Sequence, residues 1–86
     1  MNHQKQTKMK TYRNHAYTRT VEVIKTTKKC LEYGWSCNVK VTTVMNDLFN
    51  RRNGKTLTIE ERYWCGDDYL DYKTGHKYYT KNIGEQ

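Results

Sequence analysis

The chain of 86 residues has no proline, a single alanine and only thirteen Leu, Ile, Val and Phe residues. At a net charge of +7, so small an aliphatic share makes disorder an alternative to folding. Eight Tyr and two Trp residues compensate in part, because each aromatic ring can bury about 150–250 Å². The composition therefore predicts one small domain of low stability, or one that is stabilised by a partner.

Several other features are also missing. No apolar run reaches the roughly 18 residues of a transmembrane helix, and the first ten residues are polar and basic, unlike a signal peptide. Three cysteines, an odd number, fit free thiols better than a disulfide framework. We therefore expect a cytoplasmic protein with no membrane partner. The scarcity of Ala and Pro is typical of AT-rich genomes, including those of many phages and mobile elements.

The charges that are present lie unevenly along the chain. Residues 1–55 contain twelve Lys and Arg against three Asp and Glu, a net of +9, whereas residues 56–86 contain four against six, a net of −2. This distribution indicates a polyanionic partner, most often a nucleic acid. Residues 1–14 contain no acidic group and show no periodicity, so they predict a flexible basic arm.

Beyond this arm, alternating and β-branched segments predict a mainly β fold, or an α+β fold with one short helix. We expect a single antiparallel sheet domain at 15–82, built from hairpins, and a frayed tail at 83–86. The helix would lie at 27–33, between a Thr27 cap and Gly34, or at 46–52, and a strand at 28–33 is the alternative to the first. The four or five strands are expected at 16–25, 36–45, 56–64, 68–72 and 76–81.

Two turns predict two hairpins. Asn53-Gly54 suits a type I′ turn, and the resulting register needs a bulge near Thr43. That register pairs Arg52 with Lys55, Leu48 with Ile59, Asp47 with Glu60 and Val44 with Tyr63. Lys73-Thr74-Gly75 suits a three-residue loop. Its register pairs Tyr72 with His76, Asp71 with Lys77, Leu70 with Tyr78, Tyr69 with Tyr79 and Asp67 with Lys81, with Tyr69 and Tyr79 facing outward.

These expectations place the candidate binding residues in three groups. The cations of the arm and of the first hairpin tip would neutralise phosphates, and the two outward tyrosines would stack on bases. The arm supplies Lys5, Lys8, Lys10 and Arg13. The hairpin tip supplies Arg51, Arg52 and Lys55. The stacking rings are Tyr69 and Tyr79.

Metal binding and catalysis have weaker support. Cys30, Cys37, Cys65 and His76 could supply a Cys₃His set, but no Cys-x-x-Cys pair is present. The carboxylates at 67, 68 and 71 could hold Mg²⁺, although the second hairpin already pairs two of them with lysines. No nucleophile–histidine pattern or glycine-rich phosphate loop occurs. We therefore expect no enzyme, metal or cofactor.

The resulting prediction is a non-enzymatic, small basic protein that binds nucleic acid, DNA or RNA, mainly through phosphate contacts. The alternative is a phage- or mobile-element-encoded inhibitor or adaptor that binds an acidic surface of a host protein, or a ribonucleoprotein complex. A third hypothesis is a small component of a ribonucleoprotein that folds only when it binds its RNA. A homodimer could cover the second face of so small a sheet.

Overall fold

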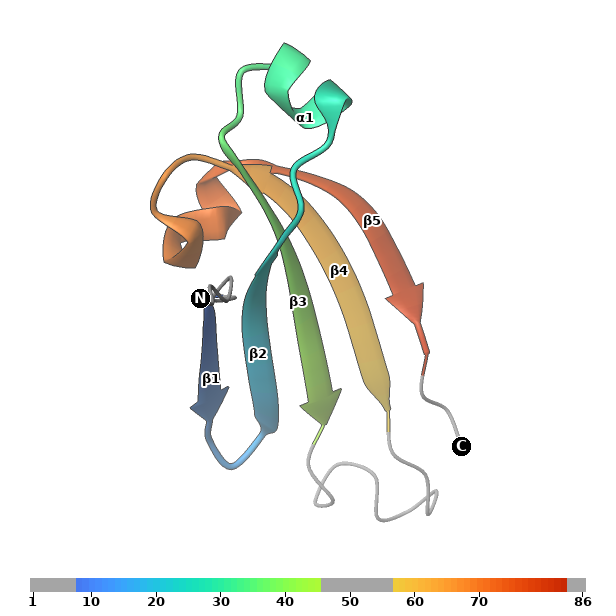
Figure 1. Ribbon diagram of the computed structural model, residues 1–86. Coiled ribbons are helices and arrows are strands. Elements are labelled where there is room, and N and C mark those ends of the chain that lie inside the picture. The colour runs from blue at the N-terminus through green and yellow to red at the C-terminus, as the bar shows by residue number, and fades with distance from the viewer. Residues whose placement is uncertain (1–7, 46–56, 84–86) are drawn as a thin grey trace, which may run out of the picture.

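The computed structural model describes residues 8–45 and 57–83, which form one five-stranded antiparallel sheet with two short helices (Figure 1). The strands lie in chain order across the sheet, β1-β2-β3-β4-β5. Neither helix of these two ranges is long or apolar enough to span a bilayer. The elements are β1 (Met9–Arg13), β2 (Tyr17–Ile24), α1 (Lys28–Glu32), β3 (Cys37–Met45), β4 (Thr58–Cys65), the 3₁₀ helix η1 (Tyr69–Thr74) and β5 (His76–Asn82).

The predicted mainly β class is confirmed. Four predicted strands, at 16–25, 36–45, 56–64 and 76–81, correspond to β2, β3, β4 and β5. The helix predicted at 27–33 is α1, in which the Thr27 side chain accepts a hydrogen bond from Cys30 N at 3.2 Å. Gly34, with φ of 87°, follows α1 in the left-handed conformation that suits glycine. The alternative helix at 46–52 lies outside the described residues.

The prediction of a flexible arm at 1–14 is wrong for its final part, because residues 9–13 form β1. Lys10 pairs with Val21 and Tyr12 with Arg19. Asn14 closes the hairpin, since its Oδ1 accepts hydrogen bonds from the backbone amides two and three residues further on, Ala16 N at 2.8 Å and Tyr17 N at 2.9 Å. An asparagine turn of this kind positions the two strands with no glycine, which the sequence pattern did not reveal.

The prediction of a strand at 68–72 is also wrong, because η1 occupies that position. Asp68 Oδ1 accepts from Leu70 N at 3.2 Å and caps the 3₁₀ helix. After η1 the chain reverses direction, and β5 pairs antiparallel with β4 and not with residues 68–72. The predicted pairs of the second hairpin are therefore absent. Lys77 contacts Glu61 at 3.4 Å, and Asp67 accepts from Ser36 Oγ at 2.8 Å.

The predicted register of the first hairpin is wrong as well. Tyr63 pairs with Val39 and Ile59 with Thr43, five positions away from the prediction, and β3 continues past Thr43 without a bulge. The adopted register places Val39 and Tyr63 together on the face that η1 covers. The proposed turn and the rest of 46–56 lie outside the described residues.

The core lies between one face of the sheet and η1. Its buried residues are Val21, Val39, Val41, Cys65 and Tyr72, with Val23, Cys37, Tyr63 and Tyr69 packed around them. The Tyr72 ring meets the Tyr63 ring edge-on at 4.7 Å between centroids. Tyr72, which is 6% exposed, is the side chain by which η1 completes the core, so aromatic rings do replace missing aliphatic ones.

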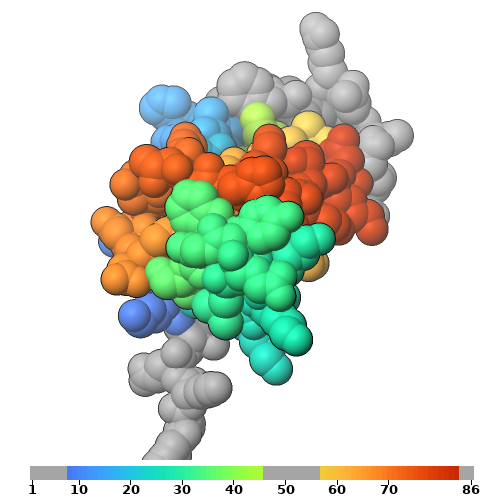
Figure 2. Space-filling view, turned by 90° about the horizontal axis from the view of Figure 1, so that it is seen from above, coloured from blue at the N-terminus to red at the C-terminus, as the bar shows by residue number. Residues whose placement is uncertain are grey.

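A second aromatic cluster lies on the opposite face, at the α1 end of the sheet. Trp64 stacks on Tyr78 at 4.7 Å between ring centroids and contacts Tyr33 at 5.4 Å and His76 at 5.5 Å. Tyr78 Oη donates to Asn38 Oδ1 at 2.5 Å. Figure 2 shows α1 lying over this end of the molecule, with η1 beside it. The two helices therefore cover different parts of the sheet.

Candidate nucleic-acid interface

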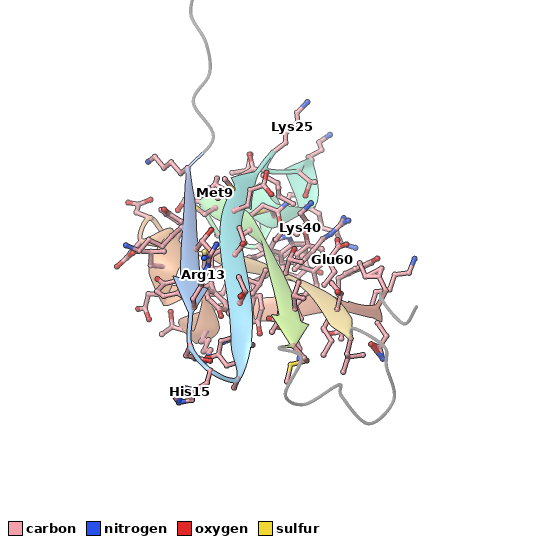
Figure 3. The ribbon with its side chains drawn as sticks, turned by 90° about the horizontal axis from the view of Figure 1, so that it is seen from below. Met9, Arg13, His15, Lys25, Lys40 and Glu60 are labelled. Carbon is pink, nitrogen blue, oxygen red and sulfur yellow. The ribbon has the colours of Figure 1, made fainter. Side chains whose placement is uncertain are left out.

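Six cations lie along β1 and along the segment that leads from β2 into α1, and we call this set the basic edge. All six side chains are exposed. Lys8 O accepts from Val23 N at 2.9 Å, which places Lys8 beside the end of β2 that leads to Lys25. Figure 3 shows Lys25 at the same end of the sheet as Met9. The basic edge consists of Lys8, Lys10, Arg13, Lys25, Lys28 and Lys29.

The acidic groups of the sheet engage cations elsewhere. Glu22 lies 3.9 Å from Lys40, Glu60 lies 2.7 Å from Arg62, and Glu61 lies 3.4 Å from Lys77. Within residues 8–45 and 57–83, no carboxylate lies within 4 Å of a basic-edge cation. Within the described residues, the basic-edge cations are therefore free of ion pairs.

The candidate cations predicted from the sequence are only partly described. Lys8, Lys10 and Arg13 lie together on β1 and at its start. Lys5 lies outside the described residues, as do the three hairpin-tip cations Arg51, Arg52 and Lys55. Of the predicted cations, the structure therefore describes only these three.

The two predicted stacking tyrosines do not form an outward pair. Tyr69 is half-buried on η1 and packs against the core, because residues 69–74 are helical. Tyr79 is on β5 opposite Arg62, whose guanidinium carbon lies 4.5 Å from the ring centroid. The Arg62 guanidinium therefore covers one face of the Tyr79 ring. The prediction that Tyr69 and Tyr79 are exposed side by side on one face of the sheet is wrong.

The sequence prediction missed Tyr12, Arg19 and the three lysines around α1. Tyr12 was assigned to the flexible arm, although Lys8, Lys10 and Tyr12 alternate as the residues of one strand face do. Tyr12 is 40% exposed and lies between basic residues. The lysines at 25, 28 and 29 were visible as charges, but only the β1–β2 pairing brings the end of β2 that leads to Lys25 beside the start of β1.

Arg19 is half-buried at the edge of the core. Its Nε donates to Thr43 Oγ1 at 3.0 Å, and its guanidinium carbon lies 4.3 Å from the Tyr17 ring centroid. No carboxylate in the described part of the chain pairs with it. Burial raises the pKa of Tyr72, while the charge of Arg19 and a hydrogen bond with it act in the opposite direction. Arg19 is thus a cation placed among aromatic rings.

A groove of about 410 Å³ lies between the β1–β2 hairpin and η1. Tyr12, Tyr17 and Arg19 line one side, and Asp71, Tyr72 and Lys73 line the other. The groove therefore combines aromatic surface with cations and adjoins the basic edge.

The cysteines and the acidic cluster do not form a metal site in the described residues. Cys37 pairs with Cys65 across β3 and β4, and Cys30 Sγ donates to the carbonyl oxygens of Trp35 and Cys37 at 3.6 Å. Burial raises the pKa of Cys65 to about 11, so its thiol stays protonated and is a poor metal ligand or nucleophile. His76 contacts Trp64 on the other face.

Comparison of the chain with protein-family models, with curated proteins and with solved structures finds no match.

Proposed function

We propose that the protein binds nucleic acid through the phosphate backbone, without catalysing a reaction. The observation that carries this proposal is the basic edge, whose six cations are exposed and have no carboxylate partner among the described residues. Such a surface has a positive electrostatic potential, which attracts a polyanion.

The gain on binding comes mainly from counterion release. Each phosphate that a lysine or arginine neutralises releases condensed counterions. Each such contact therefore contributes to the slope of log K against log salt, by about 0.7 for single strands and about 0.9 for duplex DNA. No base-reading motif accompanies the basic edge, so contacts to phosphate provide affinity and position with little sequence preference.

The test measures binding of nuclease-treated protein to labelled single-stranded DNA, single-stranded RNA and duplex DNA across a salt series. Replacing Lys28 and Lys29 by Ala should lower the slope of log K against log salt by about 1.4–1.8, because two contacts are lost. The matched control replaces Lys77 and Lys81 on the opposite edge strand, which removes the same charge. Its slope should equal that of the wild type.

Two results would contradict the proposal. One is the absence of binding to all three probes at about 50 mM salt, where a protein with several phosphate contacts still binds. The other is an equal effect of both double variants, because it would mean that net charge and not the basic edge decides binding. Equally tight binding of polyglutamate would favour the alternative, an acidic surface of a host protein.

A further inference from the structure

The groove between the β1–β2 hairpin and η1 has the composition of a ligand site. We infer that it holds one nucleotide of a single-stranded nucleic acid, with the base stacked on Tyr12 and a phosphate bound by Arg19. This inference rests on the proposed function and adds to it the form of nucleic acid and the site where a base is held.

The first argument is the size and lining of the groove. Its volume of about 410 Å³ falls within the range of roughly 300–1,000 Å³ that small-molecule sites occupy. Its walls hold three tyrosine rings and several polar groups. Aromatic surface with a few fixed polar groups is what a base with its sugar and phosphate needs.

The second argument is the charge of Arg19. Its Nε is held by Thr43, and one side of the guanidinium lies over Tyr17, so the side chain is fixed in place before any ligand arrives. A half-buried cation without a carboxylate partner gains most from an anion, and an arginine fork fits phosphate geometry. Lys73, on the η1 side of the groove, adds a second positive charge.

The third argument is the row of side chains that leads into the groove. Lys8, Lys10 and Tyr12 alternate along one face of β1, and same-face residues of a strand are spaced by about 6.8 Å. Tyr12 is opposite Arg19 in the β1–β2 register, so their side chains lie on the same face. A single-stranded nucleic acid whose phosphates contact Lys8 and Lys10 therefore reaches Tyr12 and then Arg19.

These contacts favour a single strand over a duplex. A duplex base is stacked and paired, so placing it in the groove would require the base to be flipped out at a cost of a few kcal/mol. A single strand already presents its bases, and stacking on an aromatic ring is tolerant of sequence. Asp71 also lines the groove, where its carboxylate can accept from an amino group on the base, while Arg19 and Lys73 hold the phosphate.

The experiment compares binding of a labelled 12-nucleotide single strand and of a duplex by wild type, Tyr12→Ala and Tyr12→Phe. Tyr12→Ala should weaken single-strand binding at least fivefold, the lower end of what stacking on an aromatic ring contributes. It should leave duplex binding and the salt slope unchanged. Tyr12→Phe, which keeps the ring, should bind like wild type. Tyr33→Ala is the control, because it removes an exposed ring that does not line the groove.

A second pair of variants tests the charge in the groove. Lys73→Glu should weaken single-strand binding more than Lys81→Glu does, although both make the same change in net charge on an exposed side chain. Equal effects of the two variants, or an equal loss of single-strand and duplex binding by Tyr12→Ala, would overturn the inference and leave the basic edge intact as the binding surface. Failure of the wild type to bind any probe would overturn both proposals.

Discussion

The backbone of Gly75 packs so closely against Trp64 that a Cβ on Gly75 would overlap the Trp64 carbonyl oxygen and lie 3.0 Å from Cys65 Cα. At a φ of −96°, this close approach by itself requires glycine. This contact joins the end of η1 to the last residues of β4, where the chain turns into β5.

Replacement of Gly75 by Ala should destabilise the fold by about 1–3 kcal/mol, because backbone atoms must move to admit the methyl group. For a domain of this size, each kcal/mol lowers Tm by about 4–8 °C. Thermal unfolding followed by circular dichroism measures the change. Gly66→Ala is the control, since a Cβ there has no atom within 4 Å, and equal Tm values for the two variants would contradict the prediction.

Tyr78→Phe should destabilise the protein by about 1–3 kcal/mol. Asn38 is 2% exposed, and its Oδ1 accepts from the Tyr78 hydroxyl, while its Nδ2 donates to Lys25 O at 2.8 Å. Phenylalanine keeps the stacking with Trp64 but leaves a buried acceptor unsatisfied. Urea unfolding gives the free-energy difference.

The control for this variant is Tyr79→Phe. The Arg62 guanidinium lies over the Tyr79 ring, and the Tyr79 hydroxyl makes no hydrogen bond within residues 8–45 and 57–83. The change should therefore stay within about 0.5 kcal/mol of wild type. A loss for Tyr79→Phe as large as that for Tyr78→Phe would mean that the Asn38 contact is not the cause.

Thr27→Ala should cost about 0.5–2 kcal/mol, because it removes the side-chain acceptor that caps α1 at Cys30 N. Thr27→Ser keeps a hydroxyl in the same place and should restore stability. Chemical denaturation of both variants measures the difference. If serine were as destabilising as alanine, the methyl group and not the cap would be the stabilising part of Thr27.

Stability should decrease at alkaline pH. The unfolded chain loses the Cys65 proton near the ordinary pKa of 9.0, whereas the folded chain retains it up to about 11. Between these values the folded state binds more protons, so the stabilisation is complete below about pH 9 and decreases as pH rises toward 11, by up to roughly 3 kcal/mol. Burial also raises the pKa values of Tyr63, Tyr72 and Tyr78, which acts in the same direction.

Urea unfolding at pH 8 and at pH 10.5 measures this effect. Cys65→Ala is the matched variant, because it keeps a small apolar side chain and removes the titrating thiol. Its loss of stability between the two pH values should be smaller than that of wild type, whatever its stability at pH 8. An equal loss in both proteins would assign the alkaline effect to other groups.

The sequence predicted strands where local pattern and tertiary pairing agree. β2 and β3 alternate over eight or nine residues, and each was located to within two residues. The errors lie where a side chain–backbone hydrogen bond decides the local structure. Asn14 turns β1 back onto β2, and Asp68 starts η1. Such bonds compete with strand pairing over a few residues, and periodicity does not detect them.

The residue types of the candidate site could be predicted from the sequence, but their arrangement in space could not. Charge asymmetry led to Lys8, Lys10 and Arg13, which lie on the edge strand β1 and at its start. Arg19 lies in β2, whose alternating pattern does not show that the Arg19 side chain faces the core. Its position beside Tyr12 and η1 depends on the β1–β2 register and on residues fifty positions further along, which no local pattern contains.

The order of the strands has a consequence for synthesis of the protein. Each strand pairs with the one made just before it, so the sheet can assemble at the ribosome in the order of translation. The helix that covers Val21, Val39 and Val41 comes only after β4, however. A nascent chain that has completed four strands therefore leaves Val21, Val39 and Val41 uncovered, and its core closes only once the few residues of η1 have been made.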